Sequence, residues 1–170
     1  MNAPPMEYIG TDKDNDRALY VLDVAVSDEI PKSFDTTGRY STVLIVWDAT
    51  DVAADTISRL ARRIIDAGGV YFCTWGPDCE RVHDLIDEEW VGDGFTPATD
   101  STLMTTWHDE DSLADAIWFA MYNAVPIDEY FDECRSVIAI CIGCPKRAAE
   151  VRSAFADAKR LGDHLTSPDQ

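Results

Sequence analysis

The sequence lacks any hydrophobic run of the roughly 18–20 residues that a membrane-spanning helix requires. It also begins without a secretory signal, because Met1-Asn2-Ala3-Pro4-Pro5 offers no basic stretch followed by an apolar segment. From these two absences we expect a cytoplasmic protein that does not contact a membrane.

Basic residues are scarce: 14 Lys and Arg stand against 32 Asp and Glu, which gives a net charge of −18. Such a charge opposes both the phosphate backbone of nucleic acids and anionic membrane surfaces, so direct nucleic-acid binding is not expected. The acids are spread along the chain, and solubility explains them most simply. The alternative is an acidic surface that engages a basic protein partner or mimics a nucleic acid.

The sequence also lacks the common cofactor and metal motifs. There is no Gly-x-Gly-x-x-Gly after a strand and no Gly-x-x-x-x-Gly-Lys-Ser/Thr, so no nucleotide cofactor is predicted. The five cysteines are an odd number, which argues against a disulfide framework. Cys141-Ile142-Gly143-Cys144 is a C-x-x-C pair, typical of redox or zinc sites, but no second pair at zinc spacing exists and no metal site is predicted.

What the chain does contain is a regular alternation of two hydrophobic patterns. Short apolar, β-branched runs are each followed by a segment with helical spacing, as expected for a parallel sheet with crossover helices. The four predicted strands span residues 42–47, 70–75, 103–107 and 136–142, and the helix after the third should begin at an Asp109 N-cap. We therefore predict a Rossmann-like or flavodoxin-like three-layer α/β domain with a mainly parallel sheet of four βα units.

The predicted domain covers residues 17–162 of the 170, an ordinary size for one hydrophobic core. An apolar run at 18–26 is expected to add an N-terminal strand at one edge, since no helix follows it. Residues 1–16 are predicted to be a flexible extension and residues 163–170 a C-terminal tail.

In a parallel α/β sheet, ligands bind beyond the carboxyl ends of the strands. Three of the four predicted strands end in tryptophan, at Trp47, Trp75 and Trp107. These rings could surround a cleft and stack on a planar ligand, or they could pack beneath the helix starts and close the core.

The helix starts differ in charge. Three predicted helices begin among acidic residues, which suits the positive end of a helix, whereas the fourth begins with Lys146 and Arg147. Basic residues there suit a bound anion, and Gly143 would let a phosphate or carboxylate approach the backbone. Alternatively, both side chains reach water or neighbouring acids.

Four residues near the strand ends are candidates for catalysis: Asp48, Asp78, Cys79 and His108. Asp48 takes a position common for acids in α/β enzymes, but the sequence lacks the Asp-x-Asp of haloacid-dehalogenase-like phosphatases, and a helix-cap role is the alternative. Cys79 and His108 could form a nucleophile–base pair, although Cys79 falls on the apolar stripe of its helix and suits a structural role.

Three stretches of the sequence stand out: Trp75-Gly76-Pro77-Asp78-Cys79-Glu80-Arg81-Val82-His83-Asp84, then Thr105-Thr106-Trp107-His108 followed by the predicted helix at Leu113–Phe119, and Cys134-Arg135-Ser136. Together they resemble an uncharacterised bacterial family known only as a domain of unknown function. The resemblance covers about residues 40–155 and implies no activity. It implies only that these motif residues belong together.

We therefore expect a non-catalytic accessory module that binds a small anionic ligand or a partner. One alternative is a small hydrolase or transferase that uses the four catalytic candidates, with Lys146 and Arg147 holding an anion. The other is an acidic interaction protein with a basic partner.

Overall fold

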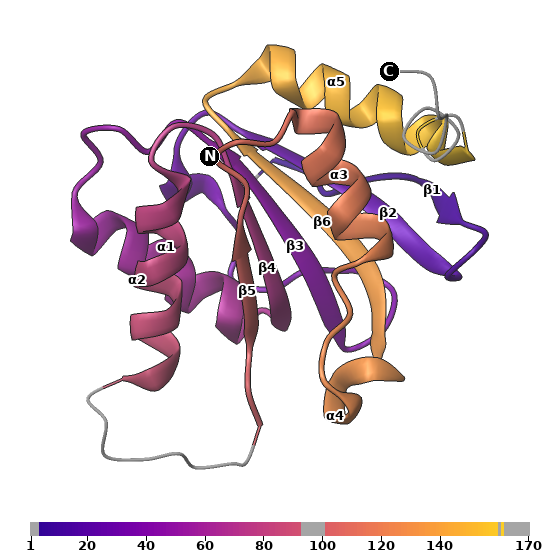
Figure 1. Ribbon diagram of the computed structural model, residues 1–170, viewed down its shortest axis with the longest axis horizontal. Helices are drawn as coiled ribbons and strands as arrows, with labels where there is room; N and C mark the ends of the chain where they lie inside the picture. Colours follow the sequence, from indigo (N-terminus) through magenta and orange to yellow (C-terminus); the bar gives the residue numbers. More distant parts are fainter. Residues whose placement is uncertain (1–3, 93–100, 160, 162–170) are drawn as a thin grey trace.

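The computed structural model describes residues 4–92, 101–159 and 161, and has a mixed α/β fold built on a six-stranded, mostly parallel sheet (Figure 1). The predicted tail at 163–170 lies outside the described residues. The strands are β1 (Glu7–Asp12), β2 (Arg17–Val24), β3 (Tyr40–Trp47), β4 (Gly69–Trp75), β5 (Met104–Trp107) and β6 (Cys134–Ile142). The helices are α1 (Ala54–Asp66), α2 (Cys79–Val91), α3 (Leu113–Tyr122), α4 (Asp128–Phe131) and α5 (Pro145–Ala156), with a 3₁₀ turn at Ser27–Glu29.

The strands lie in the order β1-β2-β6-β3-β4-β5. All neighbours are parallel except β1, which pairs antiparallel with β2. The last strand in the chain, β6, therefore lies in the middle of the sheet. The four predicted strand–helix units are present as β3-α1, β4-α2, β5-α3 and β6-α5.

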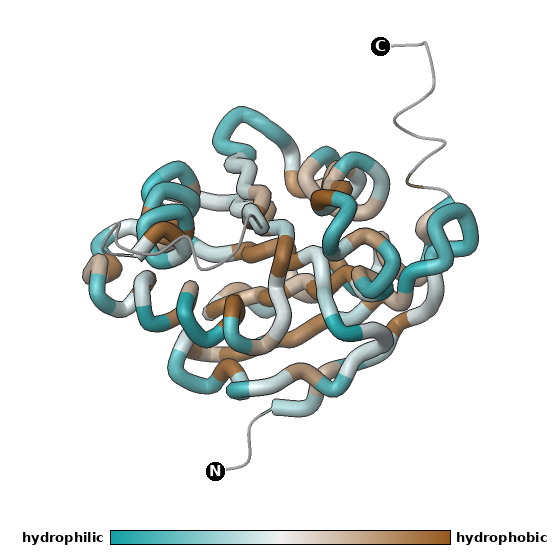
Figure 2. The backbone as a smooth tube through the Cα atoms, turned by 90° about the horizontal axis from the view of Figure 1, so that it is seen from below, coloured by the Kyte–Doolittle hydropathy of each residue, from teal (hydrophilic) through white to brown (hydrophobic). Residues whose placement is uncertain are grey.

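Helices cover both faces of this sheet (Figure 1). α1 and α2 contribute buried residues such as Leu60 and Ile86 to one hydrophobic cluster, whereas α3 and α5 contribute Ile117 and Phe155 to a second cluster on the other face. Figure 2 shows hydrophobic stretches concentrated inside and hydrophilic ones on the outer sides of the helices. Because the central strands are buried on both faces, they are continuously apolar instead of alternating.

The N-terminal part of the sheet differs from the prediction. The segment expected to be a flexible extension contributes β1, so the sheet has six strands and β1 forms its edge. β2 is consequently interior and almost wholly buried, although no helix follows it directly. The prediction failed because Glu7–Asp12 is only partly buried, and its polar sequence carries little strand signal.

The start of α3 also differs. Ser112, not Asp109, is the N-cap, and its side chain accepts a hydrogen bond from the Asp115 backbone N–H while the Asp115 carboxylate accepts one from Ser112. This capping box begins the helix later than predicted and leaves residues 108–111 as a loop at the end of β5.

No helix in the described part of the chain combines the length and the apolar character needed to cross a bilayer.

Gly76 fixes the turn that leaves β4, and a side chain there should destabilise the fold. Its φ is +116°, and an added Cβ would lie 2.2 Å from the Trp47 carbonyl oxygen. We expect Gly76→Ala to lower the free energy of unfolding by about 2–4 kcal/mol in urea denaturation. Gly10→Ala is the control, because nothing lies within 4 Å of its added Cβ. Equal unfolding midpoints for the two variants would contradict this account.

Candidate functional site

At the carboxyl edge of the sheet, the connections that follow the neighbouring strands β3 and β6 leave toward opposite faces. After β3 the chain passes through α1 on one face, whereas after the neighbouring β6 it passes through α5 on the other face. In open α/β sheets such a switch point opens a crevice for ligands. The two segments that flank it are Trp47-Asp48 and Gly143–Arg147, which belong to the predicted site.

The three tryptophans do not share one face of the sheet, and strand register explains why. Trp75 of β4 is aligned with Val46 of β3, one residue before Trp47, and Trp107 of β5 is aligned with Thr74. A shift of one residue turns a side chain to the opposite face. Trp47 therefore packs on the α1–α2 side and Trp75 on the α3–α5 side.

Their environments differ accordingly. Trp47 is 8% exposed and belongs to the core, as the packing interpretation expects. Trp107 is 45% exposed and packs edge-on against the His83 ring of α2, with the ring centroids 4.7 Å apart. Trp75 is half-buried, and the Arg147 guanidinium lies 5.3 Å from the centre of its ring. The three rings do not surround one cleft, and Trp75 is the ring that stacks with a predicted anion-binding residue.

His108 is buried and both of its ring nitrogens are engaged. Nδ1 lies 2.6 Å from a carboxylate oxygen of Asp111, and Nε2 lies 3.2 Å from the Thr106 hydroxyl. The ring also packs edge-on against Phe119 of α3. The Asp111 carbonyl in turn accepts a hydrogen bond of 2.9 Å from the Trp75 indole. A continuous network thus joins the ends of β4 and β5 to α3.

The other catalytic candidates are also held by structural contacts. Asp48 is exposed and accepts the Thr50 backbone N–H at 3.0 Å, which closes a turn in the loop after β3. It does not cap α1, whose N-cap is Ala53. Asp78 pairs with Arg81 at 2.7 Å, and Arg81 also donates to two carbonyls of the loop after β3. These contacts hold the β3–α1 and β4–α2 loops together.

Cys79 lies inside the fold. Its side chain is buried beneath the start of α2, and burial raises the pKa of its thiol despite a hydrogen bond with the His108 backbone. The imidazole nitrogens of His108 are directed to Asp111 and Thr106. The nucleophile–base arrangement considered for Cys79 and His108 therefore does not form.

The start of α5 is built differently from the other helix starts. Gly143 has a φ of +64° and donates its N–H to the Val24 carbonyl at 2.8 Å. Pro145 occupies the first turn, which contains no acidic residue, and the N-cap Cys144 makes no side-chain cap. Lys146 and Arg147 are exposed, and Arg147 also pairs with Glu150 of its own helix at 3.0 Å.

The C-x-x-C pair lies at this same turn. Cys141 is fully buried at the end of β6, whereas Cys144 is half-buried and its thiol lies 3.4 Å from the Val46 carbonyl oxygen. A hydrogen bond from Cys141, aided by the nearby Ile142 backbone and the charge of Arg147, lowers the pKa of Cys144. The same interaction and burial raise the pKa of Cys141. Among the described residues, the C-x-x-C turn included, no group of three or more His, Cys, Asp or Glu could hold a metal ion.

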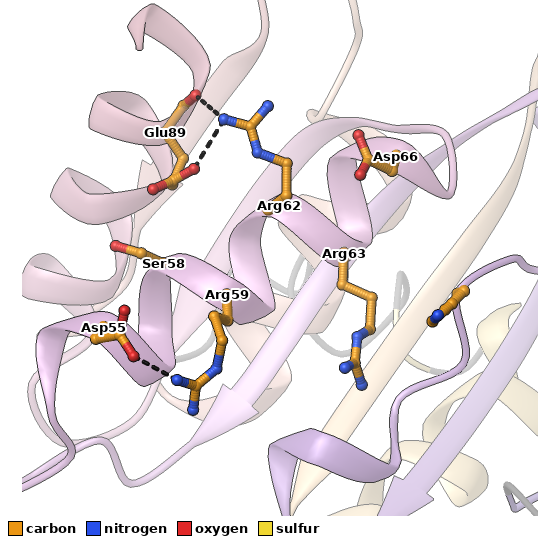
Figure 3. A pocket seen from close by; sticks show the side chains of 8 residues that line it. Asp55, Ser58, Arg59, Arg62, Arg63, Asp66 and Glu89 are labelled. Atoms are coloured by element: carbon orange, nitrogen blue, oxygen red, sulfur yellow. Dashed lines mark hydrogen bonds and ion pairs between the residues drawn. The ribbon is translucent and has the colours of Figure 1, made fainter. Parts of the chain in front are cut away.

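A groove along α1 gathers three arginines that project outward from the helix (Figure 3). It has a volume of about 530 Å³. Arg59 pairs with Asp55, and Arg62 bonds the carboxylate of Glu89 at 2.9 Å. Arg63 donates to two backbone carbonyls of the segment before β3. Since these guanidinium groups already have partners, the groove links α1 to its neighbours and offers little to an anion.

Sequence reasoning missed a second polar site, at the amino ends of the strands. Arg17, the first residue of β2, is 9% exposed and lines a small cavity. A charged residue directly before an apolar run was the available signal, but the same pattern also describes any surface residue at a strand end.

Residues 19–158 match the model of a family described as "Domain of unknown function (DUF7684)". The chain belongs to this family. The match confirms the resemblance to a domain of unknown function and extends it at both ends, from β2 into the residues after α5. Neither the curated proteins nor the solved structures gave a match.

The His108 network should contribute measurably to stability. Asp111→Ala leaves the buried Nδ1 without its acceptor, so we expect the free energy of unfolding to fall by about 1–2 kcal/mol. Asp109→Ala, two residues earlier and exposed, is the control and should stay within about 0.5 kcal/mol. Urea denaturation measures both; a loss as large for the control would mean that the loop, not the His108 contact, carries the effect.

Cys144 should be the most reactive cysteine. Its lowered pKa gives it a larger thiolate fraction at neutral pH than an ordinary cysteine, whereas burial raises the pKa of Cys73, Cys79 and Cys134. Iodoacetamide labelling followed by peptide mass spectrometry should place the first adduct on Cys144. The Cys144→Ser variant should lack the fast phase of the labelling reaction. A first adduct on any other cysteine would contradict this order.

Proposed function

We propose that the chain is a non-catalytic module that binds a small anion at the carboxyl ends of β3 and β6. The observation that carries the proposal is the switch point between β3 and β6, which is flanked by Trp47-Asp48 and Gly143–Arg147. Of these two segments, Gly143–Arg147 is the one that opens a helix with basic residues and no acid in its first turn.

Three features of this segment favour an anion. The first turn of α5 leaves backbone N–H groups without a side-chain cap, and the positive end of the helix dipole lies there. Lys146 and Arg147 add positive charge at the surface. Trp75, in contact with Arg147, offers an aromatic face at the edge of the same site. An anionic group joined to a planar body fits this combination best.

The non-catalytic part of the proposal follows from the partners of the four catalytic candidates. Asp48, Asp78 and His108 each have a structural partner, and Cys79 is buried with a raised pKa. The hydrolase or transferase alternative would need at least one of these groups to leave its partner. The acidic-interaction alternative depends on the net charge alone.

We further propose that the fold is a Rossmann-like three-layer variant. The parallel order and the helices on both faces support this, but the order departs from the flavodoxin-like 2-1-3-4-5 plan. There the first two parallel strands are neighbours, whereas here β6 separates β2 from β3.

NMR titration with pyrophosphate, and separately with AMP as a planar anion, tests the site. We expect saturable shifts of the Gly143 and Arg147 backbone amides and of the Trp75 indole N–H. Removing one cationic contact should weaken binding roughly tenfold, so Lys146→Ala and Arg147→Gln should each raise Kd by that factor.

Arg59→Gln is the matched control for Arg147→Gln, because Arg59 is also an exposed arginine paired with an acid of its own helix. Its Kd should equal that of the unmodified protein. Shifts that do not saturate, or equal losses in both arginine variants, would refute a specific site and leave only general charge effects.

A further inference from the structure

The C-x-x-C turn between β6 and α5 holds two thiols that the proposed anion site does not use. Cys141 is the second-last residue of β6 and is fully buried, whereas Cys144 is the N-cap of α5 and is half-buried. Cys141 is aligned with Val46 of β3, and the Cys144 thiol lies 3.4 Å from the Val46 carbonyl oxygen. Both cysteines pack in the hydrophobic cluster on the α3–α5 side, so they lie beside the same residue and on the same face of the sheet.

The path of the chain brings the two sulfur atoms into contact. Gly143 has a φ of +64°, in the left-handed region that favours glycine, and its N–H donates to the Val24 carbonyl at 2.8 Å. The chain turns at this residue, and the Cys141 thiol donates a hydrogen bond to the sulfur of Cys144. Sulfur atoms in such contact can form a disulfide by a small rotation of the two side chains, while β6 stays in place.

The two thiols differ in a way that suits thiol–disulfide exchange. The hydrogen bond from Cys141, the Ile142 backbone and the charge of Arg147 together lower the pKa of Cys144, although burial and the Asp23 carboxylate oppose them. The same hydrogen bond and burial raise the pKa of Cys141. The half-buried Cys144 is therefore the attacking group, and the buried Cys141 stays protonated until a first bond to sulfur has formed.

The other three cysteines lie too far away to compete for either thiol. Cys73 is on β4, which β3 separates from β6. Cys134 begins β6 at the opposite edge of the sheet, next to the Thr42 hydroxyl. Cys79 is buried at the start of α2, which covers the other face. Among the five cysteines, all of them within the described residues, Cys141 and Cys144 are therefore the pair that can be joined.

We propose that Cys141 and Cys144 form a redox-active dithiol that reduces small-molecule disulfides and is itself converted to an intramolecular disulfide. The Cys144 thiolate attacks one sulfur of the small disulfide, whose S–S bond breaks, and a mixed disulfide forms. The other half leaves as a thiolate and takes up a proton. Cys141 then bonds the Cys144 sulfur and gives its proton to the second half, which leaves as a thiol. The dithiol thereby loses two electrons, and the small disulfide becomes two thiols.

Incubation with 2-hydroxyethyl disulfide tests the proposal, with 2-mercaptoethanol as the reduced partner. Samples are quenched in acid, unfolded, alkylated and analysed by peptide mass spectrometry. We expect the tryptic peptide 136–146 to lose two hydrogen atoms and to escape alkylation, while Cys73, Cys79 and Cys134 are still alkylated. Excess 2-mercaptoethanol should reverse the change. Because this disulfide carries no charge, the result does not depend on the proposed anion site.

Three variants separate the two steps. Cys141→Ala should stop after the first step and keep a stable mixed disulfide on Cys144. Cys144→Ala should react at least roughly tenfold more slowly, because the remaining Cys141 is buried and protonated. Cys73→Ala is the matched control, since Cys73 is also a fully buried strand cysteine of the same hydrophobic cluster. It should form the intramolecular disulfide as fast as the unmodified protein.

A mixed disulfide that persists on Cys144 of the unmodified protein would mean that Cys141 does not reach it, and the proposal would be wrong. Alkylation of all five cysteines at the highest ratio of disulfide to thiol would overturn it as well, as would a disulfide that joins two copies of the chain. These results come from the unmodified protein, so they hold even where a variant fails to fold.

Discussion

The insertion of β6 between β2 and β3 is the constraint on which the rest of the structure depends. β6 is buried at every position except Arg135 and is hydrogen-bonded along both sides. Because β6 is the last strand in the chain, β2 and β3 become part of one sheet only when β6 pairs with both of them. The two polar sites described above lie at opposite ends of this strand. Its carboxyl end leads into Gly143 and Cys144, and its amino end brings Cys134 beside Thr42 and Arg17.

The hydrophobic pattern of the sequence was enough to predict the four strand–helix units of the sheet. Short apolar, β-branched runs such as Val43–Val46 are typical of a strand covered on both faces, and β3 is such a strand. Helical spacing likewise identified the buried face of α1. The same pattern could not supply strand order, because every central strand is equally apolar and would fit beside any other. The switch point, and with it the choice of Gly143–Arg147, became visible only from the pairing.

Two details were missed for different reasons. Asp109 and Ser112 are both good N-caps, but the Ser112-x-x-Asp115 spacing is a capping-box signal in the sequence itself, and the prediction overlooked it. The tryptophans end three strands at matching places, yet a register offset of one residue turns Trp75 away from Trp47 and Trp107. A regular sequence motif therefore did not become a regular site.

The two edges of the sheet also pose opposite electrostatic problems for an anion. Each crossover helix runs antiparallel to the strands, so its positive end lies at the carboxyl edge and its negative end at the amino edge. At the start of α5 the backbone itself favours negative charge, and Lys146 and Arg147 only add to it. At the end of α3 the backbone carbonyls of Ala120 and Met121 accept hydrogen bonds from the Arg17 Nη groups. The buried Arg17 cation therefore offsets the negative end of this helix, whereas at the start of α5 the backbone and the basic side chains favour the same negative charge.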